Sequence, residues 1–262
     1  MEIAGGLREG VHRAAAEGFS NAADSYGKGR PDYPPALDSW LAEELGIGPG
    51  RTVVDVGAGT GKFTTRLVAS GARVIAIEPV AKMREKLALS APEAEVLDGS
   101  AEAIPLASAS VDAIVCATAF HWFATRKALA EMHRVLKPGG MLGLVWNVRD
   151  TTVEWVARLD AIIESRVDGT PRFYTGEWRA PFPFDGFTPL QVRRLAHAHT
   201  GAVEDVIINR VRSSSVMSSM PPLQWAQIER ELRALIENEP TLAGEAVVTV
   251  PYVTLAFSTK KV

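Results

Sequence analysis

The chain has 262 residues, with 28 lysines and arginines against 31 aspartates and glutamates, so its formal net charge is −3. Hydrophobic residues make up 47% of the sequence, enough to bury a core without disulfides or a structural metal. The near-balanced charge argues against a nucleic-acid-binding face, and the single cysteine, Cys116, excludes an intrachain disulfide. No run reaches the roughly 18–20 apolar residues of a membrane span, and the N-terminus lacks the apolar core of a signal peptide. We therefore expect a soluble, cytoplasmic protein without a metal site.

The first half of the chain predicts alternating strands and helices. Residues 1–33 are rich in glycine, alanine and serine, and we interpret them as an N-terminal arm or lid. A helix is predicted after Pro34-Pro35, where apolar residues recur at helical spacing. The short apolar runs that predict strands are 52–56, 73–77, 94–97, 111–117 and 141–146. Helical patterns separate these runs, which is typical of βαβ units, so the sequence predicts an α/β fold with a doubly wound parallel sheet.

This alternation stops after residue 147. Residues 148–186 carry many aromatic side chains and indicate an insert over the sheet edge. The remaining predicted elements are two strands, 191–198 and 247–257, and two helices, 200–212 and 223–238. We therefore divide the domain at 34–262 into a cofactor-binding core, 34–147, and a part that covers the substrate, 148–262.

The stretch from Val54 to Gly61 carries the strongest functional signal. It is a strand followed by glycines at 57, 59 and 61 and then by a helical pattern. Glycines permit positive φ and let a ligand approach the backbone closely, and ligands bind at the carboxyl ends of strands in such sheets. Glu78 ends the second strand 21 residues after Gly57 (78 − 57), where an acidic side chain can accept hydrogen bonds from a ribose diol.

The third glycine distinguishes two cofactor classes that fit this pattern. A dinucleotide-binding turn needs glycine at position 62, where this chain has Lys62. Asp55 precedes the turn and suits a ligand that carries an ammonium group better than a pyrophosphate. S-adenosylmethionine has such an ammonium group, a ribose and an adenine, and it has no phosphate.

With these residues the chain resembles the class I S-adenosylmethionine-dependent methyltransferases, and within them the small-molecule enzymes of the trans-aconitate and ubiquinone/menaquinone type. The resemblance covers residues 26–147 and rests on five blocks, which are 55–61, 78–79, 99–106, 120–123 and 136–140. It implies a Rossmann-like, doubly wound, mostly parallel sheet with an antiparallel last strand, together with an N-terminal arm and an insert after strand five.

The resemblance also implies the residues that bind S-adenosylmethionine. These are Tyr26, Arg30, Asp55, Gly57, Ala58, Gly59, Glu78, Pro79, Ser100, Ala101, Thr118 and Phe120. Tyr26 and Arg30 would close over the cofactor, and Arg30 would pair with its carboxylate. Ser100 stands where many relatives have an aspartate that binds the adenine amino group, which leaves this position a backbone contact.

The acceptor side is predicted at the carboxyl ends of strands four and five. The candidate substrate residues are Trp122, Trp146 and Arg149, and the two tryptophans either form an aromatic pocket or pack beneath the insert. His121 is either a catalytic residue, as a general base or as a group that orients the acceptor, or a hydrogen-bonded loop histidine that fixes Trp122. Its ordinary pKa near 6.5 would suit proton removal.

The predicted reaction is methyl transfer to a small-molecule acceptor by in-line displacement. Alignment of the acceptor with an already activated methyl group is the main requirement of this reaction. Arg149, Arg172 and Arg179 around the insert leave a carboxylate acceptor open. Two alternatives also stay open: a non-catalytic S-adenosylmethionine-binding protein, and a nicotinamide-dependent oxidoreductase, which Lys62 disfavours. The sequence identifies neither the acceptor nor the oligomeric state.

Overall fold

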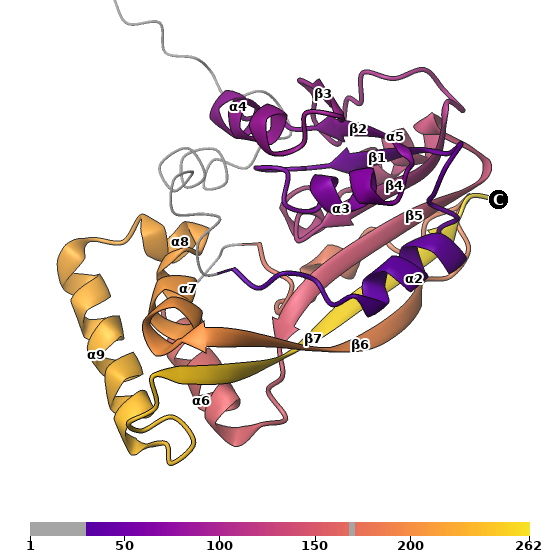
Figure 1. Cartoon of the computed structure of the whole chain (residues 1–262). Helices are drawn as coiled ribbons and strands as arrows, with labels where there is room; N and C mark the ends of the chain where they lie inside the picture. The colour runs from indigo at the N-terminus through magenta and orange to yellow at the C-terminus, as the bar shows by residue number, and fades with distance from the viewer. Residues whose placement is uncertain (1–29, 168–170) are drawn as a thin grey trace, which may run out of the picture.

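A single mixed sheet organises the molecule. The computed structural model describes residues 30–167 and 171–262, so most of the predicted arm at 1–33 lies outside the described residues. Seven strands follow the order β3-β2-β1-β4-β5-β7-β6 (Figure 1). Their bounds are β1 (Thr52–Val56), β2 (Arg73–Ile77), β3 (Glu95–Leu97), β4 (Val111–Ala117), β5 (Leu136–Arg149), β6 (Gln191–Ala202) and β7 (Val247–Lys260).

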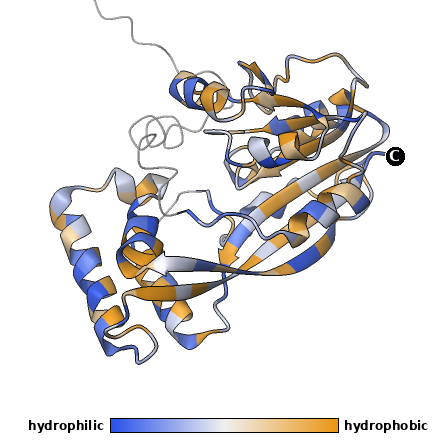
Figure 2. Ribbon diagram, in the orientation of Figure 1, coloured by the Kyte–Doolittle hydropathy of each residue, from blue (hydrophilic) through white to orange (hydrophobic). Residues whose placement is uncertain are grey.

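The pairing of the strands confirms the predicted fold class. The pairs formed among β1 to β5 are all parallel, whereas β7 runs antiparallel to both β5 and β6. β1 and β2 are buried almost throughout because helices cover both faces of the parallel part of the sheet. The strands at the centre of the sheet are accordingly mainly hydrophobic in Figure 2.

Helices cover the two faces of the sheet. On one face α2 (Ala36–Glu43) and α3 (Thr64–Ala69) contribute apolar side chains to a cluster with β1, β4 and β5. On the other face α5 (Arg126–Val135) buries four apolar side chains along one stripe, and the Thr125 side chain caps its N-terminus by accepting the Ala128 N–H. The remaining helix of this part, α4 (Ala81–Ser90), packs Leu87 near the glycine turn.

A second hydrophobic cluster, which we name the C-terminal cluster, lies at the far end of the long strands (Figure 1). Its helices are α6 (Glu154–Glu164), the π-helix η3 (Glu204–Asn209), α7 (Arg210–Arg212), α8 (Ser215–Ser218) and α9 (Pro222–Asn238). Trp155, Ile208, Trp225 and Val250 are among its buried residues. Of the two short 3-10 helices, η1 (Phe120–Trp122) lies between β4 and α5 along the chain, and η2 (Glu177–Arg179) lies between α6 and β6. Across the described residues, we find no helix with the length and apolar character needed to cross a membrane.

The structure differs most from the predicted elements at three places. β5 begins at Leu136, so the Lys137–Gly140 segment lies inside a strand and not in a turn between helix and strand. The helix predicted over 200–212 begins only at Glu204, because residues up to Ala202 extend the ladder with β7. α6 occupies part of the predicted insert, for which no helix was expected.

Candidate active site

The glycine turn between β1 and α3 forms the floor of a cavity at the carboxyl edge of the sheet. Gly57, Gly59 and Gly61 all have positive φ, at 73°, 59° and 88°. A Cβ atom on Gly57 would lie 2.9 Å from the Ala119 Cβ, and one on Gly61 would lie 2.5 Å from the Ser90 Oγ. A Cβ atom on Gly59 would meet nothing within 4 Å. Gly57 and Gly61 are therefore fixed by packing, whereas Gly59 leaves open space beside the backbone.

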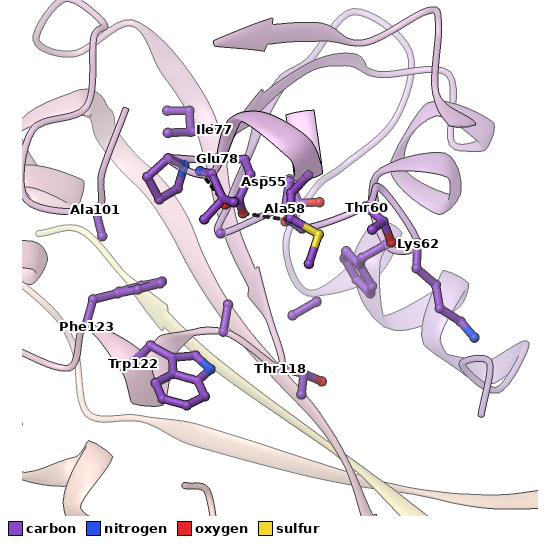
Figure 3. Close-up of a pocket in the computed structure, with 18 of the residues that line it drawn as sticks. Asp55, Ala58, Thr60, Lys62, Ile77, Glu78, Ala101, Thr118, Trp122 and Phe123 are labelled. Atoms are coloured by element: carbon purple, nitrogen blue, oxygen red, sulfur yellow. Dashed lines mark hydrogen bonds between the residues drawn. The ribbon is translucent and has the colours of Figure 1, made fainter. Parts of the chain in front are cut away.

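Two acidic side chains from neighbouring strand ends lie beside this turn (Figure 3). Glu78 is 6% exposed and accepts hydrogen bonds from the backbone N–H groups of Gly59 and Val80, each at 2.9 Å. Asp55 is 1% exposed, and its Oδ2 accepts the Thr64 hydroxyl at 2.7 Å. Its Oδ1 is buried without a hydrogen-bond partner in the described part of the chain.

Burial controls the charge of both carboxyls. It raises the pKa of Asp55 to about 7 and also raises the pKa of Glu78 above its ordinary value. The hydrogen bonds to Thr64, Gly59 and Val80 oppose these shifts. Asp55 thus presents an unsatisfied acceptor whose ionisation a nearby cation would favour.

The cavity above the turn encloses about 1240 Å³, including its open mouth. Its lining includes these predicted cofactor residues: Arg30, Asp55, Gly57, Ala58, Gly59, Glu78, Pro79, Ser100, Ala101 and Thr118. Trp122 and Phe123 lie across the cavity from Asp55 and Glu78 (Figure 3). The structure therefore brings residues from four strand ends and the described end of the arm onto one cavity.

Two predicted cofactor residues are not among this lining. Tyr26 lies outside the described residues. Phe120 is fully buried and packs against Phe123 and Phe182, with ring centroids 5.8 and 5.9 Å away. The Phe120 side chain therefore lies in the core and not in the cavity lining, whereas the adjacent Phe123 lines the cavity.

Sequence reasoning did not select several other lining residues as site residues. These include Tyr33, Thr60, Lys62, Phe63, Met83, Phe123, Asn147 and Arg210. Tyr33 could have been selected from the sequence, because it lies only three residues after the predicted cofactor residue Arg30. In the structure the hydroxyl oxygens of Tyr33 and Thr118 are 3.3 Å apart. Lys62 donates its Nζ proton to the Arg30 carbonyl at 2.8 Å. Arg210 lies far along the sequence from every predicted block, so no sequence pattern gave a reason to select it.

A second cavity adjoins the first and encloses about 960 Å³, including its mouth. The residues that line both cavities are Arg30, Thr118, Trp122, Asn147 and Arg210. Trp146 and Arg149 of β5, which we predicted as acceptor residues, line the second cavity together with Tyr252 of β7. The C-terminal cluster closes this cavity with residues of α6 and α7.

His121 also lines the second cavity and is held in place by Trp146. The indole Nε1–H of Trp146 donates to the His121 Nδ1 at 3.1 Å. Burial, with a smaller effect of Arg30, lowers the pKa of His121 to about 3, so the ring is neutral near pH 7. Because Nδ1 accepts a hydrogen bond from the indole N–H, the neutral ring carries its own proton on Nε2. This arrangement favours a hydrogen-bonded loop histidine over a general base.

The arginines that suggested a carboxylate acceptor are engaged within the protein. Arg149 forms a buried ion pair with Asp160. Arg172 pairs with Glu164 at 2.6 Å, and Arg179 stacks over the ring of Trp178 at 4.3 Å. These contacts assign the three guanidinium groups to the packing of the insert.

Comparison with known proteins identifies the family. Residues 54–144 match the family model of a methyltransferase domain. An uncharacterised methyltransferase of Mycobacterium tuberculosis is 38% identical over 237 residues, which cover 90% of this chain and 93% of that protein. An uncharacterised methyltransferase-like protein of Schizosaccharomyces pombe is 34% identical over 244 residues, which cover 93% and 95% of the two chains.

Solved structures agree with this assignment at the level of the fold. A protein of Anaeromyxobacter dehalogenans, proposed to be a type II methyltransferase, superposes with a TM-score of 0.64 at 24% identity over 88% of this chain and 96% of its own. The long matches to the curated relatives, together with the glycine turn and the sheet order, carry the assignment. The chain belongs to the class I S-adenosylmethionine-dependent methyltransferases.

Proposed function

We propose that this methyltransferase acts on a small-molecule acceptor bound in the second cavity. The observation that carries the proposal is the junction of the two cavities at Thr118, Trp122 and Asn147. Methyl transfer requires the acceptor atom to lie next to the sulfonium and in line with its S–CH3 bond. An acceptor in the adjoining cavity would lie beside the cofactor at this junction.

The first cavity suits S-adenosylmethionine chemically. The Asp55 Oδ1, which has no partner among the described residues, offers an acceptor for the ammonium group. Each Glu78 oxygen accepts one backbone N–H and keeps a lone pair for a ribose hydroxyl. The adenine would lie near Ser100 and Ala101, and Arg30 would bind the carboxylate. These roles are the ones that the resemblance implied.

The residues at the junction orient the acceptor and exclude water. S-adenosylmethionine supplies an activated methyl group, so the acceptor gains the methyl as the S–CH3 bond breaks and S-adenosylhomocysteine leaves. Trp122 lines both cavities and would separate the reacting atoms from solvent. His121 would donate a hydrogen bond from its Nε2–H to the acceptor and orient it, because its Nδ1 is occupied by Trp146. No described residue of the junction is required to remove a proton when the acceptor atom arrives deprotonated.

The enclosure of the second cavity supports a small acceptor. Residues of β5, α6, α7 and β7 surround it, so the walls come from both the sheet and the C-terminal cluster. This concave enclosure supports a small-molecule site, whereas the volume of about 960 Å³ includes open solvent at the mouth.

Calorimetry and turnover test this proposal. S-adenosylhomocysteine should bind and NADH should not, and Glu78→Gln should weaken binding by about 1–3 kcal/mol, since it removes a charged hydrogen-bond partner. Glu95→Gln, at the exposed end of β3, is the matched control and should bind as the wild type does. Gly59→Val would not test the site cleanly, because valine would be strained at a φ of +59°.

The same proteins then report on catalysis. Incubation with S-adenosylmethionine and a mixture of small metabolites should release S-adenosylhomocysteine, and Glu78→Gln should reduce this release. Tight cofactor binding without turnover on any metabolite fraction would favour the non-catalytic alternative.

A further inference from the structure

Arg210 is a cation of the second cavity without a carboxylate partner among the described residues. It begins α7 and lines both cavities. Its Nε is buried and has no hydrogen-bond partner in the described part of the chain. Burial lowers the pKa of this guanidinium below its usual value. Tyr252 and Tyr174 oppose this shift, whereas the charges of Arg30 and Arg149 act in the same direction as burial. A buried charge is costly until an opposite charge or hydrogen-bond acceptor reaches it.

Tyr252 adds a second unsatisfied donor to the same cavity. This β7 residue is 3% exposed, and its hydroxyl is buried without a hydrogen-bond partner among residues 30–167 and 171–262. Tyr252 lies opposite Arg149 in the β5–β7 ladder and lines the second cavity but not the first. A ligand that uses both Arg210 and Tyr252 would therefore lie in the acceptor cavity.

The other charges of the lining leave this cavity positive. Its lining carries the arginines 30, 149, 172 and 210, and its one described acidic residue is Glu164. Glu164 is paired with Arg172, and Arg149 is paired with Asp160 behind the wall. The positive charge of Arg210 in this lining favours an anionic ligand.

We propose that Arg210 and Tyr252 form an anion subsite, so that the methyl acceptor is a small organic acid with a carboxylate or phosphate group. The guanidinium and the phenol hydroxyl bind this oxyanion, and the apolar part of the acceptor lies against Trp146 and Phe173. This inference rests on the proposed function and assigns Arg30, not Arg210, to the cofactor carboxylate.

Calorimetry with S-adenosylhomocysteine-saturated protein tests the subsite. The probes are benzoate and phenyl phosphate, and benzamide is the uncharged analogue. The wild type should bind at least one of the two anions and should bind benzamide much more weakly. Arg210→Gln should weaken binding of that anion by about 10- to 100-fold, the usual effect of losing a charged hydrogen bond. Whichever anion binds more tightly identifies the acidic group of the acceptor.

Three further variants define the outcome. Arg210→Lys should restore part of the affinity for the anion, and Tyr252→Phe should lower it several-fold. Arg233→Gln is the control, because Arg233 is an exposed residue of α9 that pairs with Glu204 and Glu229. If Arg210→Gln does not fold, Arg210→Lys and Tyr252→Phe carry the test.

The results that would overturn the subsite are distinct from failure of the proposed function. Equal binding of benzamide and the anions, or unchanged anion binding in both Arg210 variants, would refute it. A loss of S-adenosylhomocysteine affinity in Arg210→Gln, with anion binding unchanged, would assign Arg210 to the cofactor carboxylate. If wild-type protein does not bind S-adenosylhomocysteine at all, the proposed function itself is wrong.

Discussion

Asp55 is kept partly protonated near neutral pH by its burial at the end of β1. Its pKa rises from 3.8 to about 7 in the folded protein. Between these two values the folded state holds a proton that the unfolded state has released, so the free energy of unfolding falls as the pH rises from about 4 to about 7. The same carboxyl must ionise to receive the ammonium group of the cofactor. Ionisation of Asp55 therefore favours cofactor binding but lowers the free energy of unfolding of the cofactor-free protein.

Asp55→Asn should remove this pH dependence in the cofactor-free protein. At pH 8 we expect the variant to be more stable than the wild type by up to roughly 4 kcal/mol, because the buried charge is absent. At pH 4 the two proteins should differ much less. Urea denaturation at both pH values measures this difference, with the exposed Asp38→Asn as control. Equal stability of Asp55→Asn and the wild type at pH 8 would contradict the raised pKa.

The pKa of His121 is shifted in the opposite direction from that of Asp55, so its effect on the pH dependence of stability is also opposite. Its folded pKa of about 3 lies below the ordinary value of 6.5, so the unfolded state takes up a proton first and stability is lost as the pH falls from about 6.5 to about 3. We expect nuclear magnetic resonance to show a neutral His121 ring with its proton on Nε2 down to about pH 4. His121→Gln identifies the signal. A titration near pH 6–7, or a proton on Nδ1, would restore the general-base hypothesis.

At the scale of single elements, local patterns predicted the cofactor half of the molecule well. β1, β2 and β4 were predicted at their observed bounds, because short apolar runs end at clear turns. The start of β5 was not predictable in this way, because Leu136 pairs with Val111 across a register shift that only the assembled sheet defines. Gly140 also fits tightly there, since a Cβ atom would lie 3.0 Å from the Asp112 carbonyl oxygen.

Two helices of the C-terminal half differ from the prediction, each for a different reason. α6 could have been predicted from the sequence, because the apolar residues Trp155, Leu159 and Ile163 recur at intervals of four residues. All three are buried in the structure. The start of η3 could not have been predicted from the sequence, because Thr200 and its neighbours pair with β7 until the β6–β7 ladder ends. Antiparallel pairing with β7 thus determined the boundary against the local helical pattern.

At the scale of the whole molecule, the acceptor cavity is made by segments that are distant in sequence. Trp146 and Arg149 were predictable because they end a core strand, whereas Arg210 lies 155 residues after Asp55 (210 − 55) in a segment without a motif. The β5–β7–β6 ladder brings this segment to the sheet. The cofactor site was therefore largely predictable from local motifs, and the anion subsite required the tertiary structure.

The two cavities predict a stepwise response to ligands in hydrogen exchange. S-adenosylhomocysteine should slow exchange at the glycine turn, 57–62, and at the strand ends 78–80 and 99–101, because these segments line the first cavity. Exchange at 163–167 and 171–174 should stay unchanged, since these residues line only the second cavity.

Adding benzoate or phenyl phosphate to that complex should then slow exchange at 163–167 and 171–174, as the anion draws Arg210 and Tyr252 onto one ligand. The exposed turns of α9 are the internal control and should not respond in either step. The two-step response would be specific to wild-type protein, and Arg210→Gln should show only the first step. Full protection of both sets of segments by S-adenosylhomocysteine alone would show that the cavities respond as one unit, contrary to a separate acceptor site.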